Sequence, residues 1–399
     1  MIFLKNELKE LFPFYLYYFV LGLSAMIFPF MTLYFIEIGL SFTQIGMLLA
    51  IFSLSVVLLE IPTGAIADGI SRKYSVLFGL CIAAVSVVAI SFTTEFFVLL
   101  LLFFLLGIGL AFTTGAEDAW VIDNLRKKKK SHLIDEFYIK MQSIASLGLV
   151  FAPLIGAVIV SQFGITPLWI IWGLGFFLGA VVLVFVREHF IPKKEPITLM
   201  MHSSVKNIHK GLVFSIKKKH IFFLMLAFVS FSLTTVDSDF WQPFLVDLEL
   251  PTFMVGLLFS LVAVVSTIIP FIARSLKNIS ITKAVSIIAL IRIAVISSVL
   301  FLYPGLFMLG AVVFVFTQSI HHLRYPILEP YFQKKVPSSI RATVSSVKSM
   351  VNQTGIGLMT LFAGVLADYI GLSNTIFFTS LFGILGAYFL WLSTRQSGK

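Results

Sequence analysis

Titratable side chains interrupt three of the apolar runs of this chain, where a charge is energetically costly. An ionised Asp, Lys or Arg near the centre of a membrane-spanning helix costs about 2.5 to 3.5 kcal/mol on insertion scales. Such a group needs a partner of opposite charge or a water-filled cavity, where it can bind a charged solute or carry a proton. The candidates are Glu117, Asp118, Asp237, Asp239, His321, His322 and Arg324.

Helical spacing decides which of these groups share a face. Neighbours three or four apart lie together, whereas residues two apart lie about 200° apart, so Asp237 and Asp239 cannot both face one cavity. Asp237 shares its face with Trp241, and Glu117 shares a face with Trp120. A carboxylate beside an aromatic wall suits a lipophilic cation, through charge and cation–π attraction.

The remaining candidates lie on other faces of the same runs. Asp118 points about 100° away from Glu117, and His321 shares a face with Arg324, where both can pair with acids. His321 and the adjacent His322 face different directions, and no metal-ligand spacing or nucleophile motif accompanies them. An integral membrane enzyme is therefore disfavoured, and we expect no bound metal and no cofactor.

A structural interpretation of the same acids stays open. They would then neutralise cations that also fall inside apolar runs, namely Arg292, Arg324 and Lys348. Arg292 lies on a run expected at the periphery, and no function follows for it from the sequence.

The composition indicates that membrane-spanning segments hold these titratable groups in place. Hydrophobic residues make up 59% of the 399 residues and charged residues 12%, and the mean hydropathy is +1.02. This composition is typical of a polytopic membrane protein. The single cysteine, Cys81, excludes an internal disulfide and a cysteine metal framework.

Apolar runs of about 20 residues recur along the whole chain and predict twelve membrane-spanning helices. The first run is too long for a signal-peptide core and has no small-residue cleavage site after it, so we expect it to be retained. The predicted spans are 11–36, 43–67, 75–94, 96–122, 138–161, 165–187, 220–246, 253–274, 282–303, 305–330, 340–367 and 372–394.

Basic residues fall in alternate loops between these spans. Of the 29 Lys and Arg residues, all except Arg292, Arg324 and Lys348 lie in loops or at span ends on the side of the N-terminus, whereas the opposite loops carry only acids. The positive-inside rule then predicts that both termini are cytoplasmic, in the cell membrane. The net charge of +10 follows from this topology and gives no reason to expect nucleic-acid binding.

The only long loop divides the predicted helices into two sets of six. We expect an N-terminal bundle at 1–187, a linker at 188–219 and a C-terminal bundle at 220–399. Apolar residues recur at helical spacing opposite Lys206 and Lys210, which favours an interfacial amphipathic helix over a solvated basic loop. Shifting the first half so that Lys140 meets Lys348 also places Gly156 on Gly364, as in duplicated transporters.

The segment from Glu60 to Lys73, EIPTGAIADGISRK, adds a motif between the second and third spans. With the twelve spans and the central basic loop, it resembles the major facilitator superfamily over essentially the full chain. The loop motif of that family is matched by Gly64, Asp68, Arg72 and Lys73, whereas Gly69 and Ser71 depart from it.

This resemblance implies a conformational latch on the cytoplasmic side. An ionised Asp68 at a helix end can accept backbone hydrogen bonds or pair with a cation, each worth about 0.3 to 2 kcal/mol, in one conformation only. The alternative is a loop whose charges merely fix orientation. In the same family, helices one, four, seven and ten line the central cavity, and the candidate charges fall on the last three of them.

Helix five carries a second resemblance, to the Gly- and Pro-containing pattern associated with antiporters. Gly148, Pro153 and Gly156 match it, and alanines replace two of its glycines. Small residues at this spacing also suit ordinary close packing of helices. The arginine common in helix four of proton-coupled drug antiporters is absent, since residues 105–122 contain none.

Together these observations predict a monomeric, non-enzymatic secondary transporter in a lipid bilayer. The favoured function is alternating-access export of a lipophilic or cationic small molecule, driven by protons, as in multidrug antiporters. Sodium in place of protons stays open, as do uptake of a polar metabolite by symport and export of an amphiphile or lipid.

Overall fold

The computed structural model describes residue 4 and residues 7–189, 195–276 and 279–397. In these ranges the backbone is helical between short turns and forms no strand, because a chain this apolar must satisfy its hydrogen bonds within each helix. The helices up to the long loop are α1 (Glu7–Ser24), η1 (Phe28–Phe30), α2 (Met31–Glu37), α3 (Phe42–Gly69), α4 (Arg72–Ile90), α5 (Phe96–Thr113), α6 (Ala116–Lys127), η2 (Ser131–Leu133), α7 (Ile134–Phe163) and α8 (Pro167–Val184).

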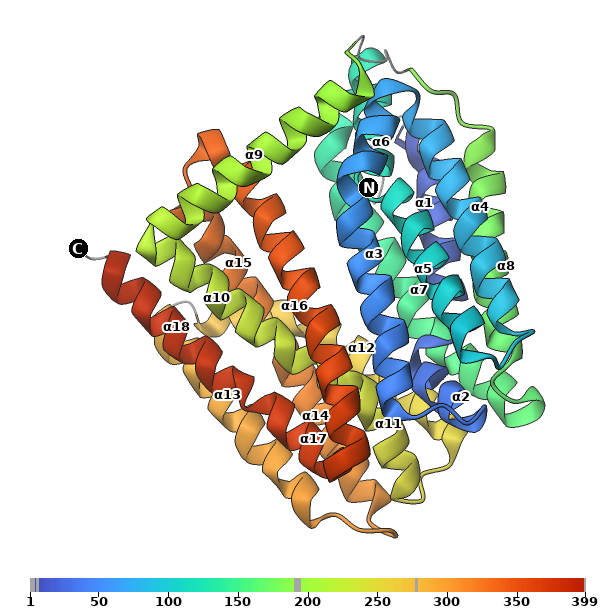
Figure 1. The fold of residues 1–399 in the computed structure, drawn as a ribbon, viewed down its shortest axis with the longest axis vertical. Coiled ribbons are helices and arrows are strands. Elements are labelled where there is room, and N and C mark those ends of the chain that lie inside the picture. Colours follow the sequence, from blue (N-terminus) through green and yellow to red (C-terminus); the bar gives the residue numbers. More distant parts are fainter. Residues whose placement is uncertain (1–3, 5–6, 190–194, 277–278, 398–399) are drawn as a thin grey trace. The chain divides into compact units, whose positions relative to one another are not determined.

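The rest of the described chain repeats this pattern of long helices (Figure 1). Its elements are α9 (Ile197–Lys217), α10 (Lys219–Leu233), η3 (Thr234–Asp237), α11 (Ser238–Asp247), α12 (Thr252–Ser275), α13 (Ile281–Ile296), η5 (Ser297–Phe301), α14 (Phe307–His322), α15 (Arg324–Lys335), η6 (Ser338–Ile340), α16 (Arg341–Ile370), α17 (Leu372–Ser380) and α18 (Phe382–Ser397).

Eleven helical stretches in the described chain are long and apolar enough to cross a membrane. The predicted tenth span, which is divided into α14 and α15 at Leu323, is not among these eleven. The predicted all-α membrane architecture is confirmed, and the eleven stretches are roughly consistent with the twelve predicted spans.

The helices form two compact units. The first contains Met1–Phe30 and Ile51–Ser204, and within it α1 packs against α7 and α8, while α4 packs between α5 and α8 (Figure 1). The crossing of α1 with α7 is close at Gly148, where a Cβ atom would lie 2.6 Å from the backbone nitrogen of Leu23. Glycine there is a packing requirement.

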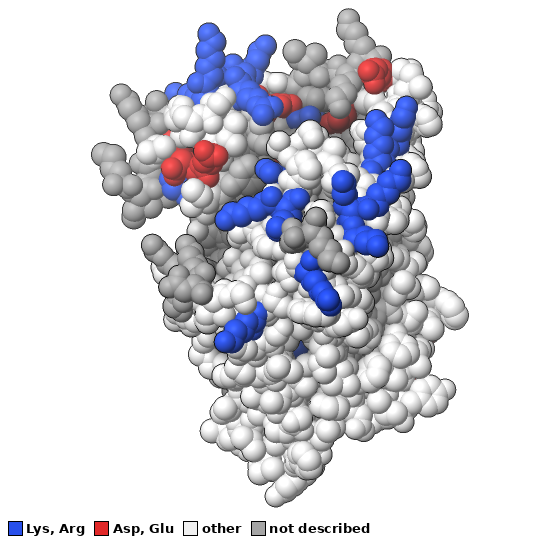
Figure 2. Space-filling view, turned by 90° about the vertical axis from the view of Figure 1, so that its left-hand side faces the viewer, with Lys and Arg blue, Asp and Glu red and all other residues white. Residues whose placement is uncertain are grey.

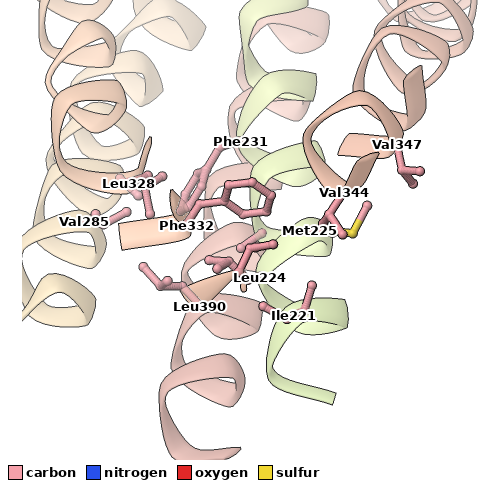
Figure 3. Packing of buried hydrophobic residues seen from close by; sticks show 13 residues of the cluster. Ile221, Leu224, Met225, Phe231, Val285, Leu328, Phe332, Val344, Val347 and Leu390 are labelled. Carbon is pink, nitrogen blue, oxygen red and sulfur yellow. The ribbon is translucent and has the colours of Figure 1, made fainter. Parts of the chain in front are cut away.

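The second unit contains Met31–Ala50 and Val205–Lys399. Its helix α10 packs against α16 and α18, and α13 packs against α14 and α18. The core between them is an apolar cluster in which Phe231 of α10 and Phe332 of α15 lie together (Figure 3). In the same unit, the Asp368 carboxylate of α16 accepts hydrogen bonds from the backbone nitrogens of Phe42 and Thr43, at 3.0 and 2.8 Å, and so caps α3.

The structure differs from the sequence prediction in the continuity of five spans, those of helices one, four, seven, ten and twelve. Helices one, four, seven and ten were predicted as unbroken runs, and each is interrupted near its middle. Pro29 and Pro326 have no N–H to donate to the carbonyl four residues earlier, which breaks helices one and ten. Gly115, at φ +75°, breaks helix four, because this left-handed conformation does not continue a helix.

Helix seven is interrupted by the 3₁₀ turn η3. There the Thr234 and Thr235 hydroxyls donate to the carbonyls of Phe231 and Ser232, at 2.8 and 2.7 Å, which competes with regular helical bonding. A similar interruption falls at Leu381 in helix twelve, between α17 and α18. Interruption is thus not confined to helices one, four, seven and ten, but the candidate charges fall on three of these, helices four, seven and ten.

The predicted linker at 188–219 lies partly outside the described residues, which omit 190–194. Its described part contains α9, and the boundary between the two units falls inside this helix. Val205, Leu212 and Ile216 expose apolar side chains along α9, beside Lys206. On the face drawn in Figure 2, the visible Lys and Arg side chains gather toward one end. Orientation in a membrane remains a prediction.

Candidate functional site

The acids of the first unit lie directly after the break in helix four. Gly115 ends the interruption, and Glu117 and Asp118 occupy the first turn of α6. The hydroxyl of Tyr17 donates to Glu117 Oε2 at 2.6 Å, and that of Tyr18 approaches Asp118 Oδ1 at 3.4 Å. Both tyrosines belong to α1, so helix one supplies hydroxyl donors to the carboxylates of helix four.

These two carboxylates have no basic partner among the described residues. Neither takes part in an ion pair, and the groups around them are the tyrosine hydroxyls, including that of Tyr138 on α7. The positive end of the α6 dipole favours a negative charge by about 0.3 to 2 kcal/mol. That is less than the cost of two intramembrane carboxylates, so the site favours a proton or a bound cation.

Asp237 of the second unit is placed differently. Its carboxylate pairs with the guanidinium of Arg292 on α13, and both side chains are buried. Gln318 of α14 donates to the other carboxylate oxygen at 3.2 Å. Arg292 also donates to the carbonyls of Thr234 and Thr317, each at 3.3 Å, so it satisfies a carbonyl in the interrupted helix seven. This pairing matches the structural interpretation of an intramembrane acid.

The two tryptophans proposed as aromatic walls are buried. Trp120 packs edge-on against Phe14 at a ring-centroid distance of 5.4 Å. Trp241 packs against Phe244 and Phe314, at 5.7 and 5.5 Å. Neither indole N–H finds a hydrogen-bond acceptor within the described chain. Asp239 is half-buried two residues from Asp237 and has no ion pair among the described residues.

Arg324 lies at the break in helix ten and is buried, with 5% of its surface exposed. Its Nη2 donates to the Thr234 hydroxyl at 3.2 Å and contacts the His321 ring, while Nε donates to the His321 carbonyl at 3.3 Å. The guanidinium lies over the Phe231 ring at 4.9 Å. The neighbouring His322 is exposed, and its ring meets that of His321 edge-on.

The other intramembrane cations are paired. Lys348 of α16 bonds Glu329 of α15 at 2.5 Å. Lys140 of α7 bonds the fully buried Glu7 at 2.6 Å and Glu136 at 2.8 Å. The two lysines matched by the internal shift therefore both bind acids within their own units.

The residues of the Glu60–Lys73 segment form an ion cluster in the first unit. Arg72 pairs with Asp68 at 3.2 Å and with Asp123 of α6 at 2.5 Å. Glu188 accepts hydrogen bonds from the backbone nitrogens of Arg72 and Lys73, at 2.8 and 3.0 Å, which caps α4. The Lys73 amine donates to the Val184 carbonyl at 2.7 Å. Gly64 lies in α3 with open space around it.

The small residues of helix five face helix one. Besides Gly148, the buried Gly156 of α7 lies close to Met26, and a Cβ there would approach the Met26 carbonyl to 3.0 Å. Pro153 is buried on the same helix. The antiporter-like pattern thus accounts for close helix packing in this structure.

Sequence reasoning missed several partners of the candidate residues. Tyr17 and Tyr18 lie one hundred residues from the acids they meet, and Arg292 was named only as one of three possible structural partners, without the acid it would bind. The sequence does indicate that the tyrosines have polar partners, since their two adjacent hydroxyls interrupt an apolar run. Glu188, directly after the sixth span, was the corresponding signal for the cap of α4.

Long apolar helices with charged groups at interior helix breaks are typical of membrane transport proteins. The family profile of the Major Facilitator Superfamily matches residues 14–358, and the chain belongs to that family.

Two curated relatives cover most of the chain. The MFS-type transporter YxaM of Bacillus subtilis (strain 168) is 25% identical over 364 residues, 88% of each chain. The MFS-type transporter MJ1560 of Methanocaldococcus jannaschii is 21% identical over 365 residues, 90% of each chain. Both are similar to this chain in length as well as in sequence.

Solved structures share the fold. The nucleoside transporter NupG matches with a TM-score of 0.75 and 15% identity, covering 98% of this chain and 100% of its own. A bacterial homologue of the lysosomal transporter Spinster matches at 0.76 and 18%, covering 98% and 97%. The D-xylose–proton symporter matches at 0.74 and 13%, covering 96% and 97%. At these identities the likeness shows the fold and not the cargo.

Proposed function

We propose that this protein is a proton-coupled exporter of lipophilic, cationic small molecules that works by alternating access. The observation that carries the proposal is the acid pair Glu117 and Asp118, which has tyrosine hydroxyls but no basic partner among the described residues. Membership of the Major Facilitator Superfamily supplies the transport class.

The acid pair suits exchange, because one carboxylate cannot hold a proton and a cationic cargo at the same time. Binding of the cation displaces the proton, and protonation releases the cation, which is the requirement for antiport. Tyr17 donates to Glu117 and so favours its charged form, whereas its apolar surroundings favour the neutral form. Opposing influences of this kind allow both states to be populated.

Asp237 is not the coupling acid in this proposal. Its carboxylate is occupied by Arg292 and Gln318, and release of a proton from a pair of this kind would require that the pair first separate. We assign Asp237 a structural role and keep Asp239 as a secondary candidate for cargo binding.

The conformational latch is part of the same proposal. Asp68 and Arg72 connect the loop after α3 to Asp123 at the end of α6, and Glu188 caps α4. These bonds hold the loop in one arrangement. We propose that this loop, both termini and the 188–219 linker are cytoplasmic, in a monomer whose bundles are 1–187 and 220–399.

Everted membrane vesicles test the transport proposal. An imposed proton gradient, acidic inside, should drive accumulation of a fluorescent lipophilic cation in the wild type and far less in Glu117→Gln and Asp118→Asn. Glu95→Gln is the matched control, because it makes the same change at an exposed carboxylate before α5. It should leave accumulation unchanged.

Two results would contradict the proposal in different ways. If wild-type vesicles with normal amounts of protein accumulate the same amount of dye with and without a proton gradient, proton-coupled export of this cargo class is excluded. Gradient-driven accumulation that survives both substitutions would retain antiport but remove the acid pair from it. Gradient-driven uptake of a neutral polar solute in right-side-out vesicles would favour symport instead.

A further inference from the structure

Arg324 is a buried cation without an acid bonded to it in the described chain. Among the described residues it contacts neutral groups: the Thr234 hydroxyl, the ring and carbonyl of His321, and the face of Phe231. Arginine keeps its charge in proteins, so burial cannot be relieved by deprotonation. A buried guanidinium is therefore stabilised by a nearby negative charge.

The acid close enough to act on Arg324 electrostatically is already engaged. Asp237 interacts with Arg324 through space, but its two oxygens are bonded to Arg292 and Gln318. Two arginines thus face one bonded carboxylate in this part of the second unit. Asp239 of α11 shows no contact with Arg324 in the described chain.

The guanidinium also has donor capacity left. Among the described residues, Nε and Nη2 carry its hydrogen bonds, and Nη1 donates none. The planar fork of arginine fits two oxygens of one carboxylate or phosphate group. His321 and Thr234 both contact the side chain, and the guanidinium lies over the ring of Phe231, which belongs to the apolar cluster of Figure 3.

We propose that Arg324, with Thr234 and His321, forms a binding subsite for an oxyanion, a carboxylate or phosphate group, inside the second unit. The breaks in helices seven and ten build it, because η3 presents Thr234 and the break at Leu323 places Arg324 opposite it. This inference goes beyond the proposed function, since it requires neither proton coupling nor export.

The test uses the purified full-length protein in detergent and measures binding of benzoate by titration calorimetry. Benzamide, its neutral isostere, is the ligand control. Benzoate should bind the wild type about tenfold or more tightly than benzamide, because a charge-assisted bidentate contact is lost in the amide. Arg324→Gln should reduce benzoate binding by about the same factor, and Arg395→Gln, at an exposed arginine, should not.

Folding of the variant is checked separately. Since Arg324→Gln removes a charge that has no bonded acid, the ligand-free variant should unfold at the same temperature as the wild type or higher. Asp239→Asn should leave benzoate binding unchanged. Tighter benzoate binding in Asp239→Asn would show that Asp239 serves as the counter-charge and would overturn the proposal.

Competition identifies the source of the anion. Displacement of benzoate by inorganic phosphate at similar concentration assigns the subsite to a free oxyanion, and resistance to phosphate assigns it to the acidic group of an organic solute. Equal binding of benzoate and benzamide, or undiminished benzoate binding in a folded Arg324→Gln variant, would overturn the proposal.

Discussion

The pairing of Asp237 with Arg292 makes a quantitative prediction about stability. In Arg292→Met, Asp237 stays buried and keeps only Gln318 as a donor, while the Thr234 and Thr317 carbonyls lose theirs. Removing one partner of a buried ion pair typically costs about 3 to 5 kcal/mol. We therefore expect Arg292→Met to lower the free energy of unfolding by about that amount.

The double variant Asp237→Asn with Arg292→Met should recover most of this loss. Replacing both members of a buried pair by neutral groups is often neutral or stabilising, because no charge is left unpaired. Asp237→Asn alone should also destabilise, since it leaves Arg292 with carbonyl acceptors only. The double variant is thus predicted to be more stable than either single variant.

Reversible unfolding in mixed micelles, followed by circular dichroism, measures all four proteins in one double-mutant cycle. Additive losses would refute the reasoning, because they would mean that the two side chains act independently. Transport in everted vesicles separates structure from function. If the stable double variant still transports, Asp237 has a structural role. If it is stable but does not transport, Asp237 takes part in the transport mechanism.

Three further predictions concern packing and caps. Gly148→Val should block the close approach of α7 to Gly22 and strongly destabilise the first unit in thermal unfolding. Gly64 has open space around it, so Gly64→Ala should leave the free energy of unfolding unchanged or raise it by about 0.4 to 1 kcal/mol. Glu188→Gln should cost about 1 kcal/mol by weakening the cap of α4, visible as faster amide exchange in its first turn. Asp368→Asn should speed exchange of the first amides of α3 in the same way, with little change elsewhere; unchanged exchange would contradict the capping role.

Hydropathy predicted the helical architecture well, because lipid leaves the backbone no alternative to internal hydrogen bonds. It did not predict the interruptions. A window of apolar residues averages over a single Gly115 or Pro326, although each removes the local geometry or the N–H that a continuous helix needs. Both residues are sequence signals for a helix break, so a rule that weighs single Gly and Pro residues divides helices four and ten.

Side-chain partners were less predictable than helices. The cost of an intramembrane charge identified Glu117, Asp237 and Arg324 as residues that need a partner, but this cost is the same whichever helix supplies it. Arg292 is 55 residues from Asp237 along the chain, and the Tyr17 hydroxyl is 100 residues from Glu117. Only the packing of helices within each unit determines such pairs.

The breaks and the charges have a common physical cause. An interrupted helix leaves backbone groups without their regular partners, and inside a membrane these must be satisfied by nearby polar side chains. Arg292 does this for the Thr234 carbonyl at the break in helix seven, and Glu117 lies where the α6 dipole is positive at the break in helix four. A polar side chain held by a break is also held in position, which is what recognition of a small solute requires. On the proposed function, moving Glu117 one turn further into α6 should reduce gradient-driven accumulation in everted vesicles, since the dipole acts within the first turn.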